Sequence, residues 1–101
     1  MIDSVIHPIN RLKICAALNA AGAVEADVKY EMRFADIRDA VDISDASLSK
    51  QLGVLEEAGY VTRFREYGLS RDKDTVWVTL TRRGKEAFDA HLVALREIAE
   101  G

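Results

Sequence analysis

The sequence predicts a mainly α-helical domain that carries one small β-hairpin. Three leucines recur at helical spacing within residues 46–58, which indicates an amphipathic helix. After this helix, residues 60–65 and 75–81 are rich in alternating β-branched and aromatic side chains, a pattern typical of strands. The polar residues 68–74 connect the two strands. With 101 residues, the chain is long enough for one domain with its own core.

Two helices are expected before this region. Pro8 suits the first turn of a helix, where its missing N–H has no cost, and this helix should run to about residue 21, before Gly22. Residues 29–33 predict a short strand. A second helix follows over residues 34–41, where apolar side chains lie at helical spacing.

Polar residues and a glycine mark the limits of the later helices. Ser44 or Asp45 can cap the third helix, because a side-chain oxygen at this position accepts an unpaired backbone N–H. Gly59 ends that helix, since glycine adopts the left-handed cap conformation at low cost. Thr81 caps a last helix over residues 82–99.

The order of these elements is that of a winged helix-turn-helix. The turn at residues 42–44 joins the second and third helices, and the hairpin follows the third helix directly. We therefore expect one domain over residues 1–101, built as a three-helix core plus a wing and a C-terminal dimerisation helix. Its recognition helix spans about 46–58, its wing about 60–81 and its C-terminal helix about 82–99.

The charge of the chain is unevenly distributed. The net charge is −3, but residues 23–59 carry −5 and residues 60–85 carry +4. A nucleic acid responds to the local field of the docked face, because salt screens charges beyond about 8–10 Å. The positive hairpin region is therefore compatible with double-stranded DNA as a partner.

The front of the third helix fits the requirements of a major groove. The groove is about 12 Å wide and accepts one helix, whose front must be small and polar so that the backbone can approach the bases. The helix front and the hairpin provide small, polar and cationic side chains for this purpose. The expected DNA-binding residues are Ser44, Ala46, Ser47, Ser49, Lys50, Arg63, Arg65, Arg71 and Lys73.

Two other interpretations of this face remain open. Serine, lysine and glycine on a helix can simply form a solvated surface. A winged helix can also bind another protein, and the acidic residues 23–59 would then repel DNA. Titration of duplex DNA at several salt concentrations distinguishes these cases.

The last helix carries an apolar stripe longer than a small domain needs to cover its core. We expect this stripe to pair with a second copy of the chain, together with part of the first helix. The alternative is an ordinary helix that closes its own domain. The expected interface residues are Ile9, Phe88, His91, Leu92, Leu95 and Ile98. A twofold dimer would present two recognition helices to a near-palindromic site.

Several functional classes are not expected. One cysteine cannot form an internal disulfide, which fits a cytoplasmic protein, and no apolar run approaches the roughly 18 residues of a membrane span. No phosphate-binding loop, HExxH or CxxC motif is present, so neither catalysis nor a cofactor is predicted. The sequence does not identify an effector.

Three segments of the chain resemble winged-helix regulators related to the MarR (multiple antibiotic resistance regulator) and ArsR (arsenic repressor) families. The segments are IHPINRLKI, LSKQLGVLEEAGYV and TVWVTLTRRGKEAF, and the resemblance covers nearly the whole chain. It implies a dimeric transcription regulator whose third helix enters the major groove and whose hairpin touches the flanking backbone. By position, it points to Ser47, Ser49 and Lys50 on the helix and to Arg71 and Lys73 on the wing.

The chain also departs from these families. Arsenic-type repressors sense metals through cysteine and histidine clusters, whereas Cys15, His7 and His91 are widely separated here. We therefore expect no metal site. Larger drug-responsive members form a ligand pocket with longer terminal helices, for which this chain has little length.

Overall fold

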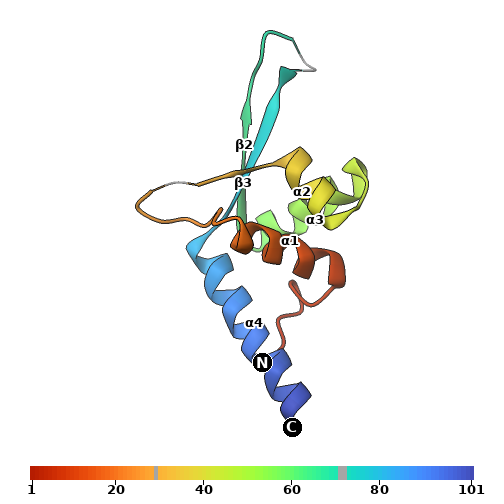
Figure 1. The fold of residues 1–101 in the computed structure, drawn as a ribbon, viewed down its shortest axis with the longest axis vertical. Coiled ribbons are helices and arrows are strands. Elements are labelled where there is room, and N and C mark those ends of the chain that lie inside the picture. Colours follow the sequence, from red (N-terminus) through yellow and green to blue (C-terminus); the bar gives the residue numbers. More distant parts are fainter. Residues whose placement is uncertain (29, 71–72) are drawn as a thin grey trace.

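The computed structural model describes residues 1–28, 30–70 and 73–101. Its elements follow the predicted order: helix α1 (Ile9–Ala20), strand β1 (Met32–Arg33), helix α2 (Phe34–Val41), helix α3 (Asp45–Glu57), strands β2 (Val61–Glu66) and β3 (Thr75–Leu80), and helix α4 (Arg82–Glu100). The hairpin of β2 and β3 projects from one end of the molecule and α4 from the other (Figure 1). These elements form a winged helix domain.

The sheet has three antiparallel strands in the order β1-β3-β2. Strand β2 pairs with β3 from Val61↔Leu80 to Glu66↔Thr75, as expected for the hairpin. The short strand predicted within residues 29–33 is confirmed as β1, which joins the hairpin by pairing with β3 through Met32↔Val78. A strand of two residues is too short to show alternation, so only its hydrogen bonds reveal that it belongs to the sheet.

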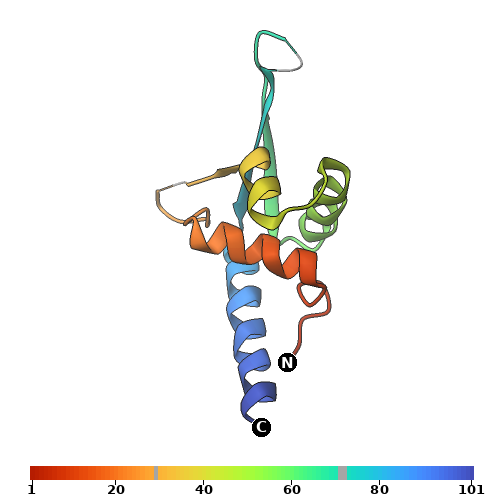
Figure 2. The same cartoon turned by 45° about the vertical axis from the view of Figure 1, so that its right-hand side comes forward.

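The core forms where α1 crosses the domain. This helix contacts the other three helices and β3, and the view in Figure 2 shows it lying across the upper end of α4. The three leucines predicted to anchor α3 are fully buried, as are Ile14 and Leu18 of α1. Full burial of one such side chain stabilises the fold by roughly 1.5–3 kcal/mol. The core therefore fixes which side of α3 faces outward.

The predicted helix limits are confirmed by their caps. The Ser44 hydroxyl accepts the Ser47 N–H at 3.1 Å, and the Thr81 hydroxyl accepts the Gly84 N–H at 2.9 Å. Gly59 has φ +81°, a left-handed conformation that favours glycine. Each cap satisfies a backbone group that would otherwise lack a partner at a helix end.

Cys15 is a core residue. Its side chain is buried, and burial together with the nearby Asp3 carboxylate raises the pKa of the thiol to about 12. The thiolate is the reactive form of cysteine, so this thiol is unreactive at neutral pH.

The apolar stripe of α4 is divided between a buried and an exposed part. Phe88 and His91 are 3% and 0% exposed, because the chain's own core and N-terminal segment cover them. This corrects their assignment to a dimer interface. Ile98 is 66% exposed, because α4 continues past the body of the domain. Among the described residues, no helix has both the length and the hydropathy to cross a bilayer.

Gly84 allows α4 to approach the start of β2 closely. A Cβ atom at this position would overlap the Tyr60 carbonyl oxygen, which is part of the backbone and cannot move aside easily. The same carbonyl accepts the Thr81 N–H at 2.9 Å. The junction between α3, the hairpin and α4 therefore requires glycine at residue 84.

We predict that Gly84→Ala lowers the free energy of unfolding by about 1–3 kcal/mol, the usual cost of overpacking. Gly53→Ala is the matched control, because its Cβ would lie 3.9 Å from the flexible Arg63 side chain, and alanine favours the helix. Urea denaturation followed by circular dichroism measures both variants. Equal stability of Gly84→Ala and the wild type would contradict the proposed packing constraint.

Candidate nucleic-acid interface

A concave surface of about 850 Å³ lies between α3 and the hairpin. We call it the groove. It brings together the start of α2, the exposed side of α3 and the inner side of the hairpin. The residues that line it are Arg33, Phe34, Ala35, Asp45, Ala46, Ser49, Arg63, Arg65, Asp74, Thr75 and Val76.

Four of the predicted DNA-binding residues line this groove. Ala46 and Ser49 are contributed by α3, whereas Arg63 and Arg65 are contributed by β2. Residues 63 and 65 share one face of β2 because side chains alternate along a strand. The small residues on α3 leave space in front of the helix, and the arginines provide positive charge beside it.

The other predicted residues lie outside the lining of the groove. Ser44 is occupied as the helix cap, and Ser47, which it caps, is half-buried. Lys50 is exposed on α3 and Lys73 is exposed on the connection between the strands. Arg71 lies outside the described residues.

Each arginine of the groove has a carboxylate partner in the same chain. Arg33 pairs with Asp36 at 3.2 Å, Arg63 with Glu56 at 3.0 Å, and Arg65 with Asp74 at 3.4 Å. The Arg33–Asp36 and Arg63–Glu56 pairs are at least partly exposed, and such pairs contribute about 0–1 kcal/mol, so a phosphate can replace these two carboxylates at little cost. Asp74 is only 10% exposed and also accepts the Gly68 N–H, so it is held more firmly.

Arg63 is held against α3 by two contacts. Its Nε and Nη2 atoms both donate to Glu56 Oε1, at 3.3 and 3.0 Å. A Cβ at Gly53 would lie 3.9 Å from Nη2, an ordinary van der Waals distance, so the guanidinium lies close to the backbone of α3 there. Glu56 thus places a cation along the exposed side of α3.

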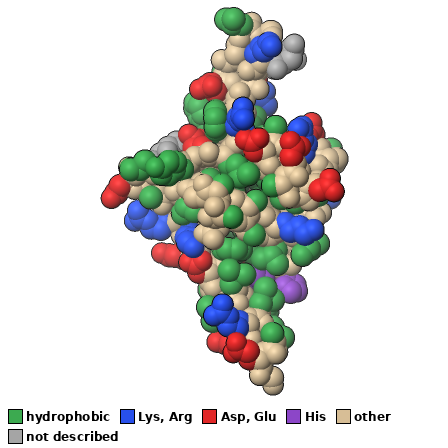
Figure 3. Space-filling view, in the orientation of Figure 1, with side chains coloured by type: hydrophobic (Ala, Val, Ile, Leu, Met, Phe, Trp, Pro, Cys, Tyr) green, Lys and Arg blue, Asp and Glu red, His purple; other side chains and the backbone are tan. Residues whose placement is uncertain are grey.

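Among the predicted DNA-binding residues that the structure describes, Lys50 and Lys73 are the cations that would bind a phosphate without losing a carboxylate partner. Within the part of the chain that the structure describes, neither ammonium group has a carboxylate within ion-pair distance. Elsewhere on this side, cationic and acidic side chains are interleaved over α2 and α3 (Figure 3). The two lysines therefore contribute more unscreened charge than the three groove arginines.

Arg33 and Asp45 are among the groove residues that were not predicted from the sequence as part of the site. Arg33 is the last residue of β1 and stands immediately before α2, so the chain turns there toward the groove. Asp45 begins α3, where an acid is favourable, and pairs with Arg38 at 3.0 Å. Asp45 and Asp39 bind the Arg38 guanidinium and raise its pKa. No periodic signal in the sequence marks Arg33, because β1 has only two residues.

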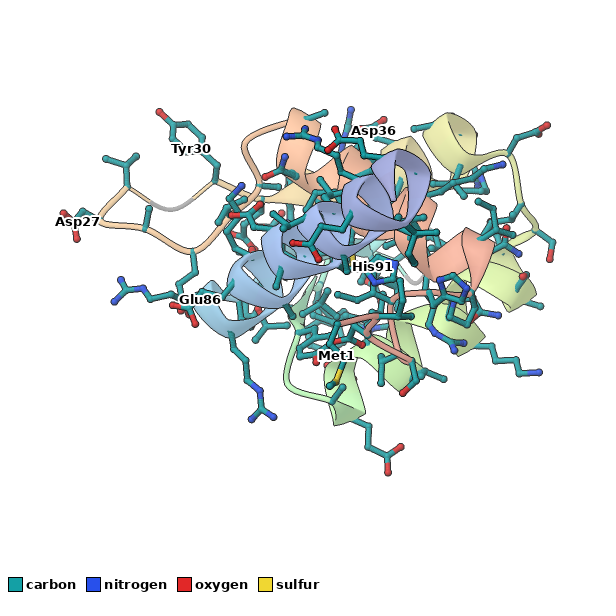
Figure 4. The ribbon with its side chains drawn as sticks, turned by 90° about the horizontal axis from the view of Figure 1, so that it is seen from below. Met1, Asp27, Tyr30, Asp36, Glu86 and His91 are labelled. Atoms are coloured by element: carbon teal, nitrogen blue, oxygen red, sulfur yellow. The ribbon has the colours of Figure 1, made fainter. Side chains whose placement is uncertain are left out.

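We predict that Asp45→Asn tightens binding of duplex DNA by roughly two- to fivefold, as expected for a surface charge interaction of about 0.5–1 kcal/mol. The substitution removes an acid from the groove and leaves Arg38 with one carboxylate partner, Asp39, in place of two. Asp27→Asn is the control, because it changes the net charge equally on a loop that projects from the body (Figure 4). Fluorescence anisotropy measures the affinities. Equal effects of the two variants would show that net charge alone matters.

Comparison with known proteins agrees with this geometry. The family model described as "Winged helix DNA-binding domain" matches residues 11–99, which include every helix and strand except the first two residues of α1 and the last residue of α4. The match does not distinguish a relationship to the MarR or ArsR families. No curated protein matches the chain. Because the match covers most of the sequence, the chain belongs to the family of winged helix DNA-binding domains.

Proposed function

We propose that the chain is a sequence-specific transcription regulator that binds double-stranded DNA as a homodimer on a near-palindromic operator. The observation that supports this most is the groove, in which small residues of α3 lie beside the arginines of the hairpin. Family membership establishes a DNA-binding domain. The dimer, the operator and the residue roles are the additional parts of the proposal, together with the MarR or ArsR relationship indicated by the sequence motifs.

The proposed binding mode uses α3 for bases and the hairpin for the backbone. Ala46 and Ser49 let the helix approach base edges, and Lys50 reaches guanine acceptors or a phosphate. Arg65 and Lys73 contact phosphates or enter a narrow minor groove, whose negative potential attracts cations. Phosphate contacts set the position of the protein, and base contacts select the sequence.

The uncovered part of α4 supports pairing with a second copy. Leu92 is 41% exposed and Ile98 is 66% exposed, and Ile9 of α1 is 61% exposed. Hydrophobic side chains continue along the lower part of the molecule, where α4 extends past α1 (Figure 3). Pairing would remove this apolar area from water and would place two recognition helices in major grooves about 34–36 Å apart. The two modules would then bind with higher avidity than one.

A specific observation favours binding of another protein as the second candidate function. The three groove arginines all form ion pairs within the chain, and residues 23–59 carry a net charge of −5. A surface neutralised in this way attracts phosphates less than its arginine content suggests. The salt dependence of DNA binding separates this candidate from the regulator.

We predict that Leu92→Asp and Ile98→Asp convert a dimer into a monomer, because each places a charge on the exposed stripe of α4. Sedimentation equilibrium measures the mass. Leu69→Asp is the control, since Leu69 is fully exposed beyond the end of β2 and lies far from α4. A dimer mass that persists in both α4 variants would refute the proposed interface.

We also predict that the wild-type affinity for duplex DNA falls steeply with salt. The slope of log K against log salt should be about −0.9 for each phosphate neutralised, so Lys50→Ala should make it less negative by about 0.9. Arg96→Ala removes the same charge from α4, at the opposite end of the molecule, and should leave the slope unchanged. A wild-type protein that ignores duplex DNA at every salt concentration would favour the protein-binding candidate.

A further inference from the structure

The N-terminal segment, residues 1–7, is tied to two distant parts of the chain by Asp3. The Asp3 N–H donates to His91 Nδ1 of α4 at 3.0 Å. Its carboxylate accepts the Tyr60 hydroxyl at 2.6 Å and also the Val5 and Ile6 N–H groups at 2.9 and 3.1 Å. We call Asp3, Tyr60 and His91 the Asp3 network. Figure 4 shows His91 between α4 and this segment, with Met1 nearby.

Tyr60 stands where the two DNA-reading elements join. It follows Gly59, which ends α3, and precedes β2. Its N–H donates to the Leu55 carbonyl of α3 at 2.9 Å, and its own carbonyl accepts the Thr81 N–H at 2.9 Å. The position of the Tyr60 side chain, which Asp3 helps to set, is therefore coupled through the Tyr60 backbone to the last turn of α3 and to the base of the hairpin.

His91 makes this connection in only one protonation state. Its Nδ1 atom accepts the Asp3 N–H, so the neutral ring carries its proton on Nε2. The side chain is 0% exposed, and Nε2 has no hydrogen-bond partner among the described residues. An unpaired buried N–H is unfavourable, and an apolar side chain would fill the site without it. What histidine adds here is an acceptor that disappears on protonation.

We propose that Asp3 and His91 are positioning residues for DNA binding, which hold the junction of α3 and the hairpin in its binding geometry only while His91 is neutral. Protonated Nδ1 becomes a donor that faces the Asp3 N–H, so this hydrogen bond breaks and the N-terminal segment loses its attachment to α4. DNA affinity then falls as the solution becomes acidic. The inference rests on the proposed DNA binding and adds its regulation by protons.

The charged and titratable groups around His91 determine the direction of this effect. Burial lowers the pKa of His91, and the positive charges of His7 and of the N-terminal amine lower it further, whereas the Asp3 carboxylate opposes them. The His7 ring lies 5.5 Å from the His91 ring. Three further titratable groups are linked to His91 through Asp3. The buried Cys15 thiol and Tyr60 both interact with the Asp3 carboxylate, and Arg83 interacts with Tyr60.

The sign of the pH effect follows from this lowered pKa. His91 is neutral above about pH 6.5, the ordinary value, so its contribution is complete there and is lost as the pH falls through the lower folded value. Burial raises the pKa of Asp3, but the hydrogen bonds from Tyr60, Ile6 and Val5 outweigh burial, so its pKa is lowered overall. The charge of His91 also lowers the pKa of Asp3, so the carboxylate favours its ionised form beside the histidine.

The test measures affinity for one duplex between about pH 5 and pH 8 at constant salt, with the folded fraction checked by circular dichroism. The wild type should bind about threefold to tenfold more weakly at the acidic end, the effect of losing one buried hydrogen bond. This direction is informative, because added positive charge by itself strengthens DNA binding. His91→Asn keeps an acceptor close to the place of Nδ1 and does not titrate, so its affinity should vary little with pH.

Three further variants separate the positioning role from other causes. His91→Phe fills the site without an acceptor and should bind weakly at every pH. Tyr60→Phe removes only the hydroxyl, so it should weaken DNA binding while leaving the Asp3–His91 hydrogen bond intact. His7→Asn removes the other histidine and should keep the acid-induced loss of affinity, but shifted to higher pH, because the charge of His7 that lowers the pKa of His91 is gone.

Measurements without DNA distinguish failure of this inference from failure of the proposed function. The nitrogen shifts of His91 and the amide shift of Asp3, followed by NMR, should change together on acidification, and sedimentation should show an unchanged mass. A wild-type pH profile retained by His91→Asn, or a dimer that dissociates in acid, would overturn the positioning role while DNA binding stands. Absence of duplex binding at every pH would remove both.

Discussion

The structure depends on burial of the leucine stripe of α3 against α1 and the sheet. Leu48, Leu52 and Leu55 are each 0% exposed, and their burial contributes roughly 1.5–3 kcal/mol per side chain. The ion pairs around the groove contribute about 0–1 kcal/mol each. The apolar core therefore sets the orientation of α3. The surface charges affect only the electrostatic potential of the face that α3 exposes.

This division has a consequence for the groove. Its arginines can exchange their carboxylate partners for phosphates without disturbing the fold, because the fold does not depend on those pairs. Glu56 still fixes the position of Arg63, close to the exposed side of α3, before DNA binds. The surface is thus ordered in the absence of DNA and has low net charge, so association should depend on fit as well as on attraction.

Local signals in the sequence were sufficient for most of the fold. Ser44, Gly59 and Thr81 defined helix limits because capping depends on neighbouring backbone groups. Local signals failed where distant contacts decide the outcome. Phe88 and His91 share their helical stripe with Ile98, and only the position of the N-terminal segment and core determines which of them is covered.

The candidate site was predicted to a similar extent. Ala46, Ser49, Arg63 and Arg65 could be found from helical and strand periodicity, and the groove brings them together. Arg33 enters the groove through a strand of only two residues, and Asp3 reaches Tyr60 across 57 positions of the chain. Neither contact has a periodic signal, so sequence reasoning alone could not identify them.

The elongated form of the domain has a consequence for a pair of subunits joined through the projecting part of α4. The molecule extends 54 Å along its longest axis, with the hairpin at one end and the C-terminal turn of α4 at the other. In a pair joined through α4, each subunit would rotate about the joined helices, with its hairpin far from the axis of rotation. A small change of the angle between the two helices would then become a large displacement of the two hairpin tips, so the spacing between half-sites would be the most sensitive property of the operator.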